Sequence, residues 1–149
     1  MGENGSMKQI KFVIPGPPKG KGRPRVVNRG GFSKAYTPKD TVAYENLVRL
    51  EYGYQVKDFK FPDGAQLDMR IQAFYGIPKS VSKKKRGLML EGMLRPTKKP
   101  DMDNVVKIIA DSLNQIAYRD DTQIVDCQCR KFYSDDPRVE VRIIQIGEV

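Results

Sequence analysis

Apolar and polar residues alternate along several stretches of the chain, which is the pattern of strands with one buried face. Four stretches have it: residues 8–14, 65–75, 124–132 and 139–146. A turn of Asp135, Asp136 and Pro137 separates the last two stretches. We therefore expect these two to pair as an antiparallel hairpin.

Two other stretches have the spacing of a helix. The first begins with Thr37 as a cap and Pro38 at the first helical position. Its apolar residues are Ala43, Leu47, Leu50 and Tyr54. The second begins at Pro100-Asp101, and its spacing predicts a core-facing stripe of Met102, Val105, Val106, Ile109, Leu113 and Ile116.

Glycine and proline interrupt the rest of the pattern. Residues 15–25 (PGPPKGKGRPR) cannot be regular, residues 28–32 suggest a hairpin or loop around Gly30-Gly31, and residues 78–92 suggest a short basic helix or loop. The order predicts one small α+β domain with a mixed or antiparallel sheet and helices packed on it. Residues 1–6 resemble a cloning remnant, so we expect the domain to span residues 7–149.

The charge balance limits the possible partners. The 149 residues include 27 Lys and Arg against 18 Asp and Glu, a net charge of +9, which favours nucleic acid as the partner. No stretch is apolar for long enough to cross a bilayer or to form a signal peptide, so we expect a cytoplasmic protein. The absence of histidine excludes Cys/His zinc sites and Ser-His-Asp triads. Cys127 and Cys129, two apart on a strand, would share a face without bonding to each other.

Aspartates gather in one acidic segment of this basic chain. The segment from residue 101 to 126 contains no glutamate and six aspartates: Asp101, Asp103, Asp111, Asp120, Asp121 and Asp126. Short carboxylates suit a hard cation such as Mg²⁺ or Mn²⁺, which can activate water without histidine. Asp103, Lys107 and Asp111 are four apart, on a helix side away from the apolar stripe.

Ordinary structural roles also explain this cluster. Aspartate at a helix start caps free N–H groups and opposes the macrodipole. Asp103, Lys107 and Asp111 can form a surface ion-pair ladder, and Asp120-Asp121 can be a turn. We expect Asp126 to be a strand-surface acid. Spacing alone does not decide between metal binding and these roles.

Two longer strings stand out in the chain. The first is KPDMDNVVKIIADSLN (residues 99–114) with YRDDTQIV (residues 118–125), and the second is residues 15–25 with Tyr36-Thr37-Pro38. Together they resemble the RusA family of Holliday junction resolvases. The resemblance covers almost the whole chain after Met7. It implies an Mg²⁺-dependent homodimer, with Mn²⁺ as a possible substitute, that cuts four-way DNA junctions symmetrically in recombination and repair.

The resemblance also implies roles for residues. The family's metal-binding carboxylates match Asp101, Asp103 and Asp121, with Asp120 beside them, and its essential lysine matches Lys107. We expect Asp111 to support Lys107. The basic residues expected at DNA are Lys19, Lys21, Arg23, Arg25, Lys83, Lys84, Lys85, Lys98 and Lys99.

Three questions stay open at this point. The chain could be a non-catalytic basic nucleic-acid-binding protein. It could also be a nuclease that acts on flaps or RNA. Symmetric cuts favour a two-fold dimer, for which the helix after Pro38 and a strand edge are both possible interfaces.

Overall fold

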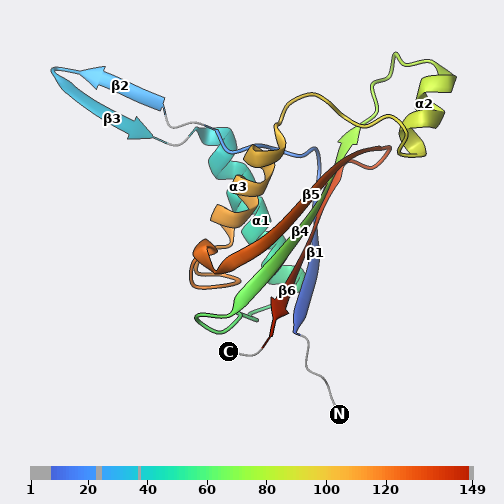
Figure 1. Cartoon of the computed structure of the whole chain (residues 1–149). Helices are drawn as coiled ribbons and strands as arrows, with labels where there is room; N and C mark the ends of the chain where they lie inside the picture. The colour runs from blue at the N-terminus through green and yellow to red at the C-terminus, as the bar shows by residue number, and fades with distance from the viewer. Residues whose placement is uncertain (1–7, 23–24, 37, 148–149) are drawn as a thin grey trace, which may run out of the picture.

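A mixed sheet with two long helices on one face forms the body of the protein (Figure 1). The computed structural model describes residues 8–22, 25–36 and 38–147, without the side chains of Arg25, Arg29, Phe32, Lys34 and Tyr36. Its elements are β1 (Gln9–Pro15), β2 (Arg25–Arg29), β3 (Phe32–Tyr36), α1 (Lys39–Gln55), β4 (Gln66–Gly76), α2 (Lys83–Leu90), α3 (Met102–Ser112), a 3-10 turn (Asp121–Gln123), β5 (Ile124–Ser134) and β6 (Arg138–Ile146). The predicted α+β class with a mixed sheet is confirmed.

The four strands of the main sheet lie in the order β1-β6-β4-β5. β4 pairs with β5 in parallel and with β6 antiparallel. The predicted hairpin of β5 and β6 is therefore wrong, because β4 lies between them. β4 and β6 bury every second residue and fill the centre of the sheet, whereas β5 has no buried residue and suits an edge.

α1 covers the sheet with a face that the apolar pattern did not indicate. The helix buries Thr41, Tyr44, Val48 and Tyr52. Leu50 and Tyr54 are 53% and 65% exposed. Tyrosine can be buried here because its hydroxyl finds a partner: Tyr52 Oη donates to the Phe59 carbonyl at 2.6 Å. The helix is confirmed, but the prediction of Pro38 as its first helical residue is wrong, because α1 begins at Lys39 and Pro38 is the N-cap residue. Thr37, the predicted cap, lies outside the described residues.

α3 buries the middle of its predicted stripe but not the ends. Val105, Ile109 and Leu113 are fully buried. Met102 in the first turn is 44% exposed and Ile116, beyond the end of the helix, is 36% exposed. The helix ends at Ser112, so Ile116 no longer follows the helical spacing.

Two smaller elements flank the start of α3. β2 and β3 pair as a hairpin whose turn residues Gly30 and Gly31 have φ values of 55° and 85°, a conformation that favours glycine. α2 is the predicted short basic helix, and Ser82 caps it by accepting from the Lys85 N–H. Figure 1 shows the hairpin and α2 on either side of the end of the molecule where α3 begins. Within the described residues, no helix is long and apolar enough to cross a membrane.

The orientation of α1 can be tested by paired truncations. Val48→Ala removes buried methyl groups and should lower the free energy of unfolding by about 2 kcal/mol. Val42→Ala, at a side chain that is 41% exposed, should change it by less than about 0.5 kcal/mol. Urea unfolding measures both, and equal losses would mean that a different face of α1 packs on the sheet.

Candidate active site

The first turn of α3 presents two carboxylates to solvent. Asp101 is the N-cap residue, yet its side chain makes no capping hydrogen bond. Asp101 and Asp103 are both exposed, as is Lys107 one turn further on. Capping therefore does not account for Asp101, and its carboxylate is available to a ligand.

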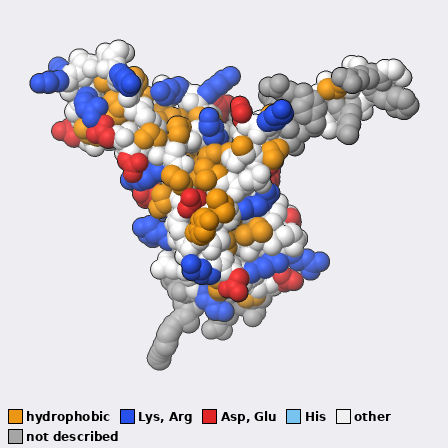
Figure 2. All heavy atoms as spheres, turned by 180° about the vertical axis from the view of Figure 1, so that it is seen from behind, with side chains coloured by type: hydrophobic (Ala, Val, Ile, Leu, Met, Phe, Trp, Pro, Cys, Tyr) orange, Lys and Arg blue, Asp and Glu red, His pale blue; other side chains and the backbone are white. Residues whose placement is uncertain are grey.

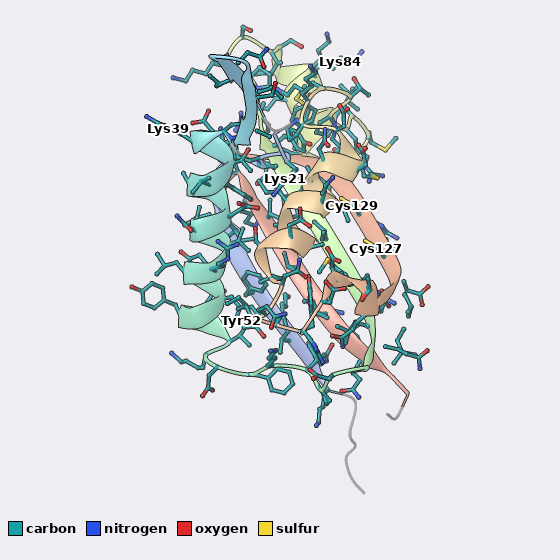
Figure 3. All side chains as sticks on the ribbon, turned by 90° about the vertical axis from the view of Figure 1, so that its left-hand side faces the viewer. Lys21, Lys39, Tyr52, Lys84, Cys127 and Cys129 are labelled. Atoms are coloured by element: carbon teal, nitrogen blue, oxygen red, sulfur yellow. The ribbon has the colours of Figure 1, made fainter. Side chains whose placement is uncertain are left out.

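The ion-pair ladder considered as an alternative for α3 is not formed at Asp111, which makes a different ion pair. Asp111 Oδ2 lies 3.3 Å from Lys21 Nζ, which also donates to Glu45 Oε2 at 2.7 Å. Lys21 comes from the Gly/Pro-rich loop and Glu45 from α1, so the contact joins three segments. Figure 3 shows Lys21 between α1 and α3. We name Lys21, Glu45 and Asp111 the Lys21 bridge.

The Lys21 bridge is partly shielded from water. Side-chain exposure is 21% for Lys21, 12% for Glu45 and 28% for Asp111. Burial acts to lower the pKa of Lys21, but the hydrogen bonds and charges of Glu45 and Asp111 outweigh it and the pKa is raised. Lys21 is therefore charged at neutral pH and committed to carboxylates. Its expected contact with DNA stays a prediction, as does support of Lys107 by Asp111.

Asp121 faces Asp111 from the 3-10 turn that precedes β5. The backbone N–H of Asp121 donates to Asn114 Oδ1 at 2.8 Å, which fixes the turn against the end of α3. Burial, a hydrogen bond shared with Asp111 and the charges of Asp120 and Asp111 raise the pKa of Asp121, against a lowering hydrogen bond with Asn114. The two carboxylates repel each other, and a proton or a cation at this place would relieve the repulsion.

Asp120, unlike Asp121, stabilises the 3-10 turn through its own hydrogen bonds. Its carboxylate accepts from the Thr122 hydroxyl at 2.5 Å and from the Thr122 N–H at 3.3 Å. The hydroxyl contact is the largest cause of a lowered Asp120 pKa. Gln123 completes a capping box with Asp120. The turn role considered for this pair thus applies to Asp120, while Asp121 is turned towards Asp111.

The carboxylates lie at two places along α3. Asp103 and Asp111 are eight residues apart, about 12 Å along the helix axis. No group of three or more Asp, Glu or Cys side chains that could hold a metal ion occurs among the described residues. The predicted ligand set of Asp101, Asp103 and Asp121 stays a prediction.

The donor chemistry at both places suits a hard divalent cation. Mg²⁺ prefers oxygen ligands, and it commonly takes one or two carboxylates and completes its shell with water and substrate phosphate. Asp101 and Asp103 offer exposed carboxylates that no described hydrogen bond uses. Asp111 and Asp121 offer a close pair whose mutual repulsion a cation would relieve. The carboxylates at both places are therefore suitable ligands for a cation such as Mg²⁺.

A lysine-lined hollow opens beside Asp101. It has a volume of about 650 Å³ and is lined by Pro18, Lys19, Gly20, Lys21, Lys99, Pro100, Asp101 and Asn104. The loop approaches α3 closely, and the Lys21 N–H donates to the Asn104 carbonyl at 3.0 Å. A side chain at Gly20 would put its Cβ 2.9 Å from Pro100 Cβ, so glycine is required for this approach.

The other basic candidates lie around the same end of the molecule. Lys83, Lys84 and Lys85 are exposed on α2 (Figure 3 labels Lys84). Lys98 and Lys99 precede Asp101, and the Lys98 carbonyl accepts from Lys131 Nζ at 2.8 Å. The side chains of Arg23 and Arg25 lie outside the described part of the chain. Contact of these residues with DNA stays a prediction.

Three residues of this region were not expected. Glu45 pairs with Lys21, Asn114 holds the Asp121 turn, and Tyr75 Oη donates to the Pro100 carbonyl at 2.6 Å, which anchors the start of α3. Asn114 was part of the motif string and could have been chosen from it. Glu45 and Tyr75 carry no signal in sequence, because only the packing brings them to the site.

Comparison with known proteins gives two findings. Residues 15–144 match the profile of a family described as Endodeoxyribonuclease RusA. A Bacillus subtilis (strain 168) protein described as uncharacterized protein YqaN is 39% identical over 143 residues. The alignment covers 95% of this chain and 99% of that protein.

The Lys21 bridge predicts a stability difference between neighbouring lysines. Lys21→Met leaves two partly buried carboxylates without their cation and should lower the free energy of unfolding by about 2 kcal/mol or more. Lys19→Met, at an exposed residue of the same loop, should change it by less than about 0.5 kcal/mol. Equal values in urea unfolding at pH 7 would show that the bridge contributes nothing to stability.

Proposed function

This chain belongs to the RusA endodeoxyribonuclease family, and on that premise we propose that it resolves four-way DNA junctions by paired, symmetric phosphodiester hydrolysis. Membership implies a hydrolase that cuts within DNA chains. The observation that carries the proposal is the start of α3, where exposed carboxylates uncommitted to capping adjoin a lysine-lined hollow. We further propose that the protein acts as a homodimer in DNA recombination and repair, in the cytoplasm.

The proposed cofactor is Mg²⁺, with Mn²⁺ as a substitute. We propose that Asp101 and Asp103 bind the cation at the start of α3, and that Asp121, with Asp120 beside it, binds a cation at the second place, next to Asp111. Asp111 joins this set because it is among the groups that raise the pKa of Asp121. When bound, such a cation polarises a phosphoryl oxygen and lowers the pKa of a bound water. Carboxylates and a divalent cation supply this chemistry in a chain that has no histidine.

Lysines supply the complementary positive charge. Lys107 is exposed on the same side of α3 as Asp103, one turn away, and it can stabilise the negative charge that develops on the scissile phosphate. Lys19 and Lys99 line the hollow beside Asp101 and can hold a neighbouring phosphate. Lys21 has an indirect role. The Lys21 bridge attaches the loop that contains Lys19 to both α1 and α3.

The shape of this end of the molecule suits branched DNA. The β2–β3 hairpin and α2 project on either side of the start of α3 (Figure 1). α2 presents Lys83, Lys84 and Lys85 to solvent. Phosphate contacts of this kind position a duplex without selecting its sequence. Recognition of junction shape by flanking basic elements is consistent with this arrangement.

Substitution of Asp103 tests the mechanism. Asp103→Asn removes one carboxylate charge while keeping the shape of the side chain. Binding to a four-way junction should be unchanged or tighter, because a negative charge next to phosphate is lost. Cleavage with Mg²⁺ should fall by about 100-fold or more, as expected when a group that stabilises transition-state charge is removed. Gel-shift and single-turnover cleavage assays measure the two effects.

The matched control is Asp126→Asn, which removes an exposed acid from β5 and should leave both quantities unchanged. Cleavage by Asp103→Asn at the wild-type rate would exclude this carboxylate from the chemistry.

Side-by-side assays on a four-way junction, a flap and an RNA duplex identify the substrate. A preference for the flap or the RNA, or no cleavage of any substrate with Mg²⁺ or Mn²⁺, would contradict the junction assignment.

A further inference from the structure

The outward face of α1 carries an apolar stripe that is exposed except at Leu47, which packs partly against the core. Ala43, Leu47, Leu50 and Tyr54 follow one another at intervals of 4, 3 and 4 residues, the spacing of a coiled-coil seam. Leu50 and Tyr54 are 53% and 65% exposed. Figure 2, which views the molecule from behind, shows hydrophobic side chains along the middle of this face, where α1 lies. We call these four residues the α1 stripe.

The α1 stripe is complementary to itself. Its intervals of 4, 3 and 4 are the same in both directions along the helix. An antiparallel pair of α1 helices therefore puts Leu47 opposite Leu50 of the second copy, and Ala43 opposite Tyr54 of the second copy. The smallest residue of the stripe then meets the largest, at both ends. This is the isologous arrangement that a two-fold interface requires.

A hollow lies where the second copy's Tyr54 would come. It has a volume of about 270 Å³ and is lined by Lys19, Asp40, Ala43, Tyr44 and Leu47. Ala43 and Leu47 belong to the α1 stripe, and the small side chain of Ala43 leaves room there for an aromatic ring. Exposed aromatic side chains that enter a pocket are the usual anchors of protein interfaces.

Tyr44 in this hollow has an unused polar group. Its side chain is buried, and its hydroxyl has no hydrogen-bond partner among the described residues. A buried hydroxyl without a partner is costly and rare. The hydroxyl is not accessible from the surface, so a second copy could supply its partner only if the Tyr44 side chain changes its conformation.

Charges at the ends of α1 fit the same antiparallel register. Lys39 and Asp40 begin the helix, and Lys57 and Asp58 follow its end. All four are exposed, and Figure 3 shows Lys39 at the outer end of α1. The register that pairs Leu47 with Leu50 brings the start of one α1 to the end of the other, where each copy carries one acid and one base. Lys57, with a φ of 73°, has left the helix, so the helical register does not assign individual pairs among these four residues.

We propose that two copies of this chain associate through antiparallel packing of their α1 stripes about a two-fold axis between residues 48 and 49. The inference rests on the homodimer of the proposed function and names its interface. A short helix pair is at the small end of specific interfaces, so a micromolar dissociation constant is expected. An apolar stripe fits a second apolar helix better than the charged backbone of nucleic acid.

This interface leaves the carboxylates of the candidate active site open, although Lys19 lines both the hollow beside Asp101 and the hollow at the interface. α1 meets α3 through Glu45 in the Lys21 bridge and through Arg49, whose Nε donates to the Ser112 carbonyl at 3.0 Å. At about 100° per residue, these two residues lie more than about 100° around the helix from the middle of the α1 stripe. Asp103 and Lys107 on α3 thus stay accessible to DNA in the dimer.

An acidic residue in the stripe tests the interface. Leu50→Asp should raise the dissociation constant of the dimer by at least about 30-fold in sedimentation equilibrium. Val42→Asp is the matched control, because it puts the same acid on an exposed apolar site of α1 outside the stripe and should leave the constant within about 3-fold. Circular dichroism confirms that both variants fold. Equal dimerisation of the two variants would overturn the inference.

A disulfide tests the register. In a Cys127→Ser/Cys129→Ser background, Ala43→Cys with Tyr54→Cys should form a covalent dimer under mild oxidation. Ala43→Cys alone should not, because the two copies of residue 43 would lie 11 residues apart along the helix pair, about 16 Å. Linking of the single variant and not of the double variant would overturn the antiparallel register.

Junction cleavage is measured on the same proteins, which separates this inference from the proposed function. If Leu50→Asp dimerises as tightly as the wild type while Asp103→Asn abolishes cleavage, the proposed interface is wrong and the nuclease assignment stands. If the wild type is monomeric at all concentrations, both the interface and the homodimer are wrong. If no substrate is cut but Leu50→Asp breaks the dimer, the interface stands and the nuclease assignment fails.

Discussion

The Lys21 bridge is the contact on which the arrangement of the site depends. One ammonium joins the loop of residues 16–22 to Glu45 on α1 and Asp111 on α3. The loop is then close enough to α3 that only glycine fits at residue 20. The side chains of the bridge are largely shielded from water, so forming the ion pair requires the free energy of desolvating the charges. Well-placed hydrogen-bond partners are needed to offset this free energy. It also partly offsets the charge of Asp111 beside Asp121, and it brings Lys19 to the hollow next to Asp101.

The acid cluster that first marked the chain has separated into different roles. Asp120 holds a turn, and Asp121 faces Asp111 across the end of α3. Asp101 and Asp103 extend into solvent at the beginning of the helix. This division gives the proposed metal two exposed carboxylates where a phosphate can approach, and a second carboxyl pair further along the same helix. The family assignment supports a reaction on DNA phosphodiesters at this place, and the lysines around it supply the charge that such a substrate needs.

The sequence predicted most elements because their signals are local. Alternation along β4 and the glycine pair at the β2–β3 turn need no knowledge of neighbouring strands. The pairing of β5 with β4 could not be predicted from spacing, because a parallel contact is set by packing across the whole α2–α3 crossover. The buried face of α1 was also missed, because Tyr44 and Tyr52 form its core while Leu50 and Tyr54 point outwards. The motif string located α3 and its acids but not Glu45, which is 24 residues from Lys21.

The most direct test of this account is to locate the divalent cation on the protein. Substoichiometric Mn²⁺ added to isotopically labelled protein broadens the NMR signals of amides close to the ion. The account predicts that the first signals to disappear are those of Met102, Asp103 and Asn104 at the start of α3, together with Asp121, and that excess Mg²⁺ restores them. Broadening confined to other acids, such as Asp126 on β5, or no broadening along α3, would contradict the proposal that these carboxylates hold the metal.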